Sequence, residues 1–221
     1  MRIAFITIGQ SPREDVMSEL RRYLEGVEYL ELGLLDGLSE EEISSLKAEG
    51  SEVEYVTRLR SGEEVRVSRR KLEPLLEKKL NSLRGVDLAI MLCTGEFEVS
   101  SKAPLIYPWE IMVSIVESLN PRKLGVIVPL QSQIGYAYRR WSSLCEDLRI
   151  CSWSPYLDRE PDLRELADRQ LIIMDCIGYS IKHEQVVRRT TGALILRPRP
   201  AIGVLLKALK AAGQRVWREG I

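Results

Sequence analysis

The sequence predicts an α/β protein made of two similar halves, each a mainly parallel sheet flanked by helices. Along the whole chain, short apolar runs typical of buried strands alternate with segments of helical periodicity. This order is typical of parallel sheets that are covered on both faces. The same motif also occurs twice: an apolar run ends in Cys, with Gly two residues later, at 88–95 (LAIMLCTG) and at 171–178 (LIIMDCIG). A chain of 221 residues is long enough for one large domain or two small ones.

The first half opens with a buried strand at 3–9 and a second strand at 27–35. Between them, Ser11, Pro12 and Glu14 have the spacing of a capping box with Pro at the first helical position, which predicts a helix starting there. Ser39 and Glu42 repeat the capping-box spacing before a short acidic helix. Apolar and polar residues alternate over 53–67 around Ser61-Gly62, which predicts a β-hairpin. Leucines at helical spacing over 72–80 predict a helix that Pro74 should start or kink.

The second half repeats the alternation. The expected strands are 105–108, 123–130, 148–153, 171–178 and 193–198, and the expected helices are 109–119, 131–145, 161–169, 183–189 and 201–212. The boundary between the halves is predicted in the polar stretch 96–102.

The composition excludes several classes of function. Lys and Arg (32) balance Asp and Glu (32), so no nucleic-acid partner is expected. No apolar run approaches the roughly 18–20 residues that a membrane span needs, and the apolar N-terminus is too short for a signal peptide. We therefore expect a cytoplasmic protein without a membrane partner. With one His and four Cys that form no CxxC pair, a metal site is not expected either.

The two strand-end cysteines, Cys93 and Cys176, suggest a particular chemistry. Ligands bind at the carboxyl ends of strands in parallel α/β sheets, where backbone N–H groups and helix N-termini favour a thiolate. Two such thiols on opposite sides of a substrate would suit proton transfer at a carbon beside a carboxylate, which needs one base per face and N–H donors for the enediolate. That reaction requires no cofactor. The alternative is that both cysteines are inert core residues, as Cys145 and Cys151 are expected to be.

Five stretches together resemble the AroM family over essentially the whole chain. They are ITIGQSPR at the start, DGL at 36–38, VSRRKLE at 67–73, KLGVIVPLQ at 123–131 and LIIMDCIGY at 171–179. That family has no firmly established activity, and its name implies an operon link with aromatic amino-acid biosynthesis.

More distantly, the layout is similar to the aspartate/glutamate racemase superfamily, which includes hydantoin racemases, arylmalonate decarboxylases and maleate isomerases. This resemblance implies two pseudo-symmetric lobes with a ligand cleft between them and a catalytic Cys at a strand end in each lobe. The C-terminal helix would return to the first lobe, giving domains of 1–100 plus 200–221 and of 101–199. It also implies carboxylate-binding loops, formed by Gly9, Gln10 and Ser11 in one lobe and by Gln131 and Ser132 in the other.

Other candidate ligand-binding residues follow from their positions. Arg13, Arg69 and Arg70 could clamp a carboxylate, although the two arginines at 69–70 also fit a solvated helix start. The backbone around the thiols adds Thr94, Gly95 and Gly178, and the phenol of Tyr179 is expected to be a donor in the cleft. His183 is a lesser candidate for pairing with Cys176. Asp175 should lie away from the thiol, because side chains alternate along a strand.

The sequence therefore predicts a cofactor-independent isomerase, racemase or lyase that acts at the α-carbon of a small carboxylate. The alternative function is a non-catalytic protein that binds or senses such a carboxylate. A homodimer is an assembly that the sequence leaves open.

Overall fold

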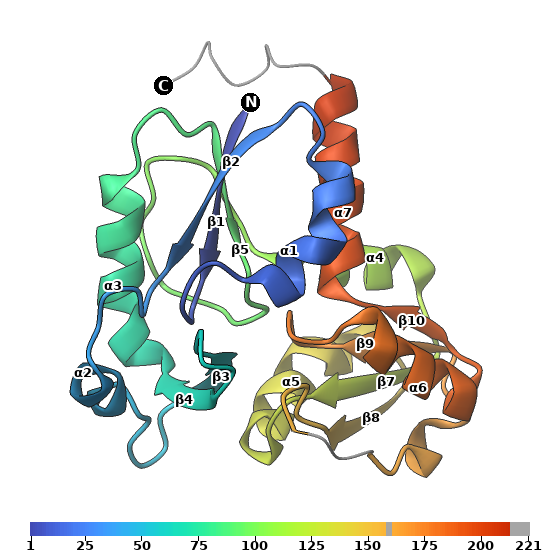
Figure 1. Ribbon diagram of the computed structural model, residues 1–221. Helices are drawn as coiled ribbons and strands as arrows, with labels where there is room; N and C mark the ends of the chain where they lie inside the picture. The colour runs from blue at the N-terminus through green and yellow to red at the C-terminus, as the bar shows by residue number, and fades with distance from the viewer. Residues whose placement is uncertain (158–160, 213–221) are drawn as a thin grey trace. The chain divides into compact units, whose positions relative to one another are not determined.

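The computed structural model describes residues 1–157 and 161–212, and the chain divides into two compact units (Figure 1). Unit 1 comprises Met1–Pro108 and the segment from Arg199 onward, and unit 2 comprises Trp109–Pro198. No helix among the described residues is long and apolar enough to cross a membrane.

Unit 1 is built on a parallel four-stranded sheet in the order β2-β1-β5-β6. These strands are β1 (Arg2–Thr7), β2 (Glu28–Gly33), β5 (Leu88–Met91) and β6 (Leu105–Ile106). The other elements are α1 (Glu14–Leu20), η1 (Arg21–Tyr23), α2 (Glu40–Ser45), the antiparallel hairpin β3 (Glu54–Arg58) and β4 (Glu64–Ser68), α3 (Arg69–Ser82) and α7 (Pro198–Ala212). In Figure 1, α3 lies on one side of the β1–β2–β5 sheet and α1 and α7 lie on the other.

Unit 2 is built on a second parallel sheet, in the order β10-β9-β7-β8. Its strands are β7 (Lys123–Val128), β8 (Asp147–Ser152), β9 (Leu171–Met174) and β10 (Leu194–Leu196). Its helices are α4 (Pro108–Leu119), α5 (Ile134–Trp141) and α6 (Ile181–Thr191), with 3-10 turns η2 (Gln131–Gln133), η3 (Ser142–Leu144) and η4 (Arg164–Leu166).

The two sheets share one topology. If the hairpin is set aside, the second strand of each unit pairs with the first, the first with the third, and the third with the fourth. Four consecutive residues of β5 and of β9 are fully apolar and buried, as expected for central strands of a covered parallel sheet. The predicted fold class of parallel sheets flanked by helices is therefore confirmed within each unit.

The hairpin and the capping box at Ser39 are also confirmed, whereas the helix cap at Ser11 and the helix over 161–169 are wrong. Ser11 does not cap α1, which begins at Glu14; the Ser11–Pro12 peptide is cis, and the Ser11 hydroxyl donates to Asp36 instead. Pro74 does not start α3, because the helix already begins at Arg69 and runs to Ser82. Residues 161–169 form only the 3-10 turn η4 and irregular chain, and this single turn is enough to bury the apolar Leu163 and Leu166.

Candidate functional site

The carboxyl ends of the first and third strands adjoin in each sheet, and this is where candidate site loops lie. In unit 1, β1 leads to Gly9–Ser11 and its neighbour β5 leads to Cys93. In unit 2, β7 leads to Gln131–Gln133 and its neighbour β9 leads to Cys176. The strand order reverses direction at this point of each sheet, and ligands of open α/β sheets bind at such switch points.

The Cys93 loop is held by a tyrosine of the hairpin. The sulfur of Cys93, a residue only 8% exposed, accepts the backbone N–H of Gly95 at 3.3 Å. The Tyr55 hydroxyl accepts from the N–H of Glu96 at 3.0 Å and donates to its carbonyl at 2.9 Å. A Cβ on Gly95 would lie 2.5 Å from the Tyr55 ring, so the loop needs glycine there.

The Cys176 loop repeats this geometry. The sulfur of Cys176, 7% exposed, accepts the N–H of Gly178 at 3.4 Å. A Cβ on Gly178 would lie 2.7 Å from Pro155 and from the hydroxyl of Tyr156, so an aromatic residue crowds this glycine as well. Both thiols therefore follow the third strand, receive an N–H from the residue two positions on, and lie beside a glycine that a tyrosine approaches. A hydrogen bond to sulfur favours the thiolate, which is the reactive form.

Tyr179 does not have the predicted role. The side chain is fully buried in the core of unit 2, and its hydroxyl donates to the Trp153 carbonyl. Burial, followed by the charges of Cys176, Cys151 and Asp175, raises the pKa of the Tyr179 phenol well above its ordinary value. The expectation of a donor in the cleft is wrong because the aromatic ring completes the core and the hydroxyl already has an acceptor.

His183 caps a helix. Its Nδ1 accepts the Ser180 N–H at 3.0 Å and lies 2.9 Å from the Ser180 hydroxyl, which completes a capping box at the start of α6. The ring also packs edge-on against Trp153, with centroids 4.9 Å apart. This nitrogen therefore organises the end of the Cys176 loop.

The Gly9–Ser11 loop is held by Asp36 and Arg60, which are not among the predicted site residues. Asp36 accepts from the Ser11 N–H at 2.8 Å and from its hydroxyl at 2.5 Å. Arg60, from the turn of the hairpin, donates its N–H to the Gln10 side chain at 3.0 Å, its Nε to the Ser11 carbonyl, and its Nη2 to Asp36 at 3.0 Å. The DGL motif at 36–38 was a signal for Asp36, but nothing in the sequence linked Arg60 to residues fifty positions earlier.

Gly9 itself touches the hairpin. A Cβ there would lie 2.4 Å from the Thr57 hydroxyl and 2.6 Å from the Arg58 carbonyl. Strand β3 therefore contacts both site loops of unit 1, through Thr57 at Gly9 and through Tyr55 at Gly95.

The three arginines proposed as carboxylate clamps all bind acidic side chains of the protein. Arg13 is buried and donates to Asp15 from Nε at 2.8 Å and from Nη2 at 2.7 Å. Burial raises the pKa of Asp15, but the Arg13 guanidinium, with further help from Arg199 and Arg58, outweighs it and lowers the pKa overall. Arg69 pairs with Glu73 at 3.2 Å and with Glu98 at 2.6 Å, and the exposed Arg70 lies 3.3 Å from Glu52.

The corresponding loop of unit 2 is exposed. Gln131 and Ser132 lie in the 3-10 turn η2, which leads directly into α5. The Gln131 side chain accepts from the Ser152 hydroxyl at 2.9 Å, which links the loop after β7 to the last residue of β8.

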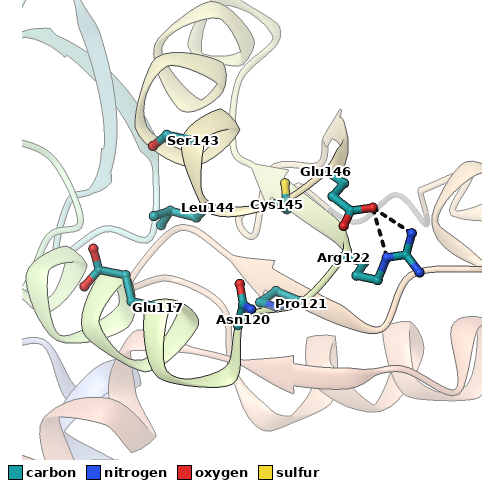
Figure 2. Close-up of a pocket in the computed structure, with 8 residues that line it drawn as sticks. All are labelled: Glu117, Asn120, Pro121, Arg122, Ser143, Leu144, Cys145 and Glu146. Atoms are coloured by element: carbon teal, nitrogen blue, oxygen red, sulfur yellow. Dashed lines mark hydrogen bonds and ion pairs between the residues drawn. The ribbon is translucent and has the colours of Figure 1, made fainter.

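The remaining cysteines do not belong to these loops. Burial, together with the charges of Glu165 and Asp162, raises the pKa of Cys151 to about 11, so its thiol stays neutral at physiological pH. Cys145 lines a hollow of about 400 Å³ with Asn120, Pro121 and the Arg122–Glu146 ion pair (Figure 2). That hollow adjoins the residues just before β7 and β8, so it lies at the opposite edge of the sheet from Cys176.

Metal ligands do not cluster in the part of the chain that the structure describes. Over 1–157 and 161–212, no group of three or more His, Cys, Asp or Glu residues has an arrangement that could hold a metal ion.

Comparison with known proteins identifies a family and a fold. The model of the family described as "AroM protein" matches residues 3–209, which confirms the resemblance seen in the sequence. No curated protein matches the sequence.

The solved structures similar to this chain include three racemases. Allantoin racemase from Klebsiella pneumoniae is 15% identical, with 100% of this chain and 91% of that chain covered and a TM-score of 0.64. Glutamate racemase from Aquifex pyrophilus is 15% identical, with 95% of this chain and 84% of that chain covered and a TM-score of 0.59. Aspartate racemase from Picrophilus torridus is 11% identical, with 97% of this chain and 96% of that chain covered and a TM-score of 0.57. At these identities the likeness concerns the fold, and the predicted racemase-like α/β fold is confirmed.

Proposed function

We propose that this chain, which belongs to the AroM family, is a cofactor-independent isomerase, racemase or lyase acting at the α-carbon of a small carboxylate. One observation carries the proposal. Each unit has a thiol after its third strand, at the switch point of the sheet, with a backbone N–H directed at the sulfur. Two unrelated structural cysteines would have no reason to share all three properties. The racemases of similar fold support the same kind of reaction.

In the proposed isomerase reaction, the two thiols exchange roles. The thiolate of one cysteine removes the α-proton, the electron pair of the C–H bond moves into an enediolate, and the thiol of the other cysteine returns a proton to the opposite face. Backbone N–H groups of the site loops stabilise the developing negative charge. Protons and charge balance between the two sulfurs, so the chemistry needs no metal or organic cofactor. We place the reaction in the cytoplasm.

A second function is favoured by a different observation. Cys93 and Cys176 are only 8% and 7% exposed. A protein that binds or senses a small carboxylate without transforming it would not need an accessible, reactive thiol.

Exchange of the α-proton with solvent tests the proposal. We would incubate small 2-substituted mono- and dicarboxylates with the protein in deuterated water and follow loss of the α-proton signal by NMR. Wild-type protein should exchange at least one compound. Cys176→Ala and Cys93→Ala should each abolish racemisation, because one of the two faces loses its base, while each variant keeps exchange on the face whose thiol remains.

Cys145→Ala and Cys151→Ala are matched controls, since both remove a thiol outside the site loops, and they should keep the activity. Full activity in Cys176→Ala would contradict the proposal. A compound that raises the melting temperature and protects Cys176 from iodoacetamide, but never exchanges its α-proton, would favour the binding protein.

A further inference from the structure

A buried ion pair includes Asp175, the residue immediately before Cys176. Asp175 accepts the Trp141 indole N–H at 2.9 Å and lies 3.1 Å from Nη1 of Arg140. The side chains of Arg140 and Asp175 are each only 4% exposed. Both partners of Asp175 come from α5, whereas Cys176 packs in the core with Tyr179 and Val187. The two neighbouring side chains therefore have different surroundings, as the alternation of side chains along a strand predicts.

Arg140 joins several parts of unit 2. Its guanidinium lies 4.9 Å from the centre of the Trp109 ring and 4.9 Å from that of Tyr136, and it donates to the Tyr136 hydroxyl at 2.8 Å. The arginine thus connects the start of α4, helix α5 and the residue next to the thiol.

A buried ion pair such as Arg140–Asp175 adds little to the stability of the fold. The free energy lost when two charges leave water is offset only if their geometry is good, and an apolar pair of similar volume is often as stable or more stable. A buried charge next to a reactive group, however, shifts the balance between the thiol and the thiolate. A carboxylate disfavours the thiolate, and a guanidinium favours it.

Several other charged or titratable groups belong to the elements packed around this loop. They are Cys151 of β8, Tyr156 after β8, Tyr179 of the loop itself, His183 and Glu184 of α6, and Arg197 after β10. Arg197 pairs with Glu184 at 2.8 Å, but Glu184 is only partly buried and also binds Arg188 at 2.7 Å, whereas both members of the Arg140–Asp175 pair are buried.

We infer that Arg140 and Asp175 are positioning residues that set the reactivity of Cys176. The negative charge of Asp175 disfavours the Cys176 thiolate, and the positive charge of Arg140 offsets that effect. The inference rests on the proposed function for its purpose. Its test does not, because the ionisation of a thiol is measured without a substrate.

The test is the pH dependence of alkylation. The rate at which iodoacetamide modifies Cys176 is followed by peptide mass spectrometry, which separates this cysteine from the other three. Asp175→Asn keeps an acceptor for the Trp141 indole but leaves the Arg140 charge uncancelled, so the profile should move down by about one pH unit. Arg140→Met removes the positive charge that balances the Asp175 carboxylate, so the profile should move up by about as much. The double variant should return close to wild type.

A merely structural role gives a different pattern. Loosening of the loop would increase alkylation in both single variants without moving their profiles in opposite directions, and that result would overturn the inference. Arg140→Lys keeps the charge and should restore the wild-type profile. Arg169→Met is the matched control, because Arg169 is another buried arginine of unit 2, bound to Asp147 at 2.9 Å at the other edge of the sheet. It should lower the melting temperature and leave the profile unchanged, and a shift in this control would also count against the inference.

Discussion

The Cys93 loop and the Cys176 loop have the same local geometry but are supported by different means. In unit 1, a tyrosine from an inserted hairpin holds the loop through neutral hydrogen bonds to Glu96. In unit 2, Arg197 donates to the Tyr179 carbonyl at 3.1 Å and pairs with Glu184 at 2.8 Å, and the buried Arg140–Asp175 pair holds the residue before Cys176. The N–H-to-sulfur contact therefore comes from the Cys-x-Gly segment itself, and the surrounding fold needs only to keep that segment in place.

Because the Cys93 and Cys176 loops are supported by different contacts, they should respond differently to substitutions. Strand β3 contacts both site loops of unit 1, so displacement of the hairpin would disturb both together. The Cys176 loop depends on buried charges, whose removal leaves an uncompensated partner. We expect the unit 2 loop to be the more sensitive to loss of a single side chain, and the unit 1 loop to be the more sensitive to crowding.

The largest effect is expected from Arg197→Met. The arginine is 2% exposed, and its loss removes the donor that binds the Tyr179 carbonyl and one carboxylate oxygen of Glu184. The free energy of unfolding should therefore fall by about 3 kcal/mol. Chemical denaturation measures the change. Arg188 binds the same Glu184 at 2.7 Å but its side chain is 55% exposed, so Arg188→Met should cost less than about 0.5 kcal/mol. Equal costs for the two variants would show that burial of the charge does not decide the stability of this loop.

A smaller effect should separate the two glycines. In Gly95→Ala the new Cβ meets the ring of Tyr55. That ring cannot move away, because its hydroxyl is hydrogen-bonded to both the N–H and the carbonyl of Glu96. We therefore expect the free energy of unfolding to fall by about 2 kcal/mol. In Gly178→Ala the Cβ meets the far end of Tyr156 and the Pro155 ring, and about 1 kcal/mol is expected. Melting temperatures of the two variants provide the comparison. A larger loss for Gly178→Ala would reverse our assignment of the more tightly crowded loop.

The smallest effect concerns alkaline pH. Burial raises the pKa of Cys151 from 9.0 to about 11, so the folded protein keeps this thiol protonated where the unfolded chain would lose the proton. The stabilisation is complete below pH 9 and is lost as pH rises towards 11, which should lower the free energy of unfolding by about 1 kcal/mol at pH 10. In Cys151→Val this part of the decline should disappear. An unchanged decline in the variant would assign the alkaline loss to other groups, with the buried phenol of Tyr179 as the first to examine.

The sequence by itself determined the order of strands and helices, the repeated Cys-x-Gly segments at the ends of buried strands, and the family. These features are local, because apolar periodicity, capping residues and a glycine next to a thiol each act over a few neighbouring residues. The box at Ser39 formed as its spacing predicts for that reason.

Only the tertiary structure decided which partners the polar residues have. Ser11 has the spacing of a helix cap, yet a carboxylate twenty-five positions away, Asp36, binds both its N–H and its hydroxyl. Tyr179 is buried in a core, and Arg60 reaches a loop fifty residues earlier. Such pairings depend on which segments the sheet brings together, and no pattern of neighbouring residues encodes that. The local sequence therefore placed the thiols at the strand ends, and the fold decided which side chains surround them.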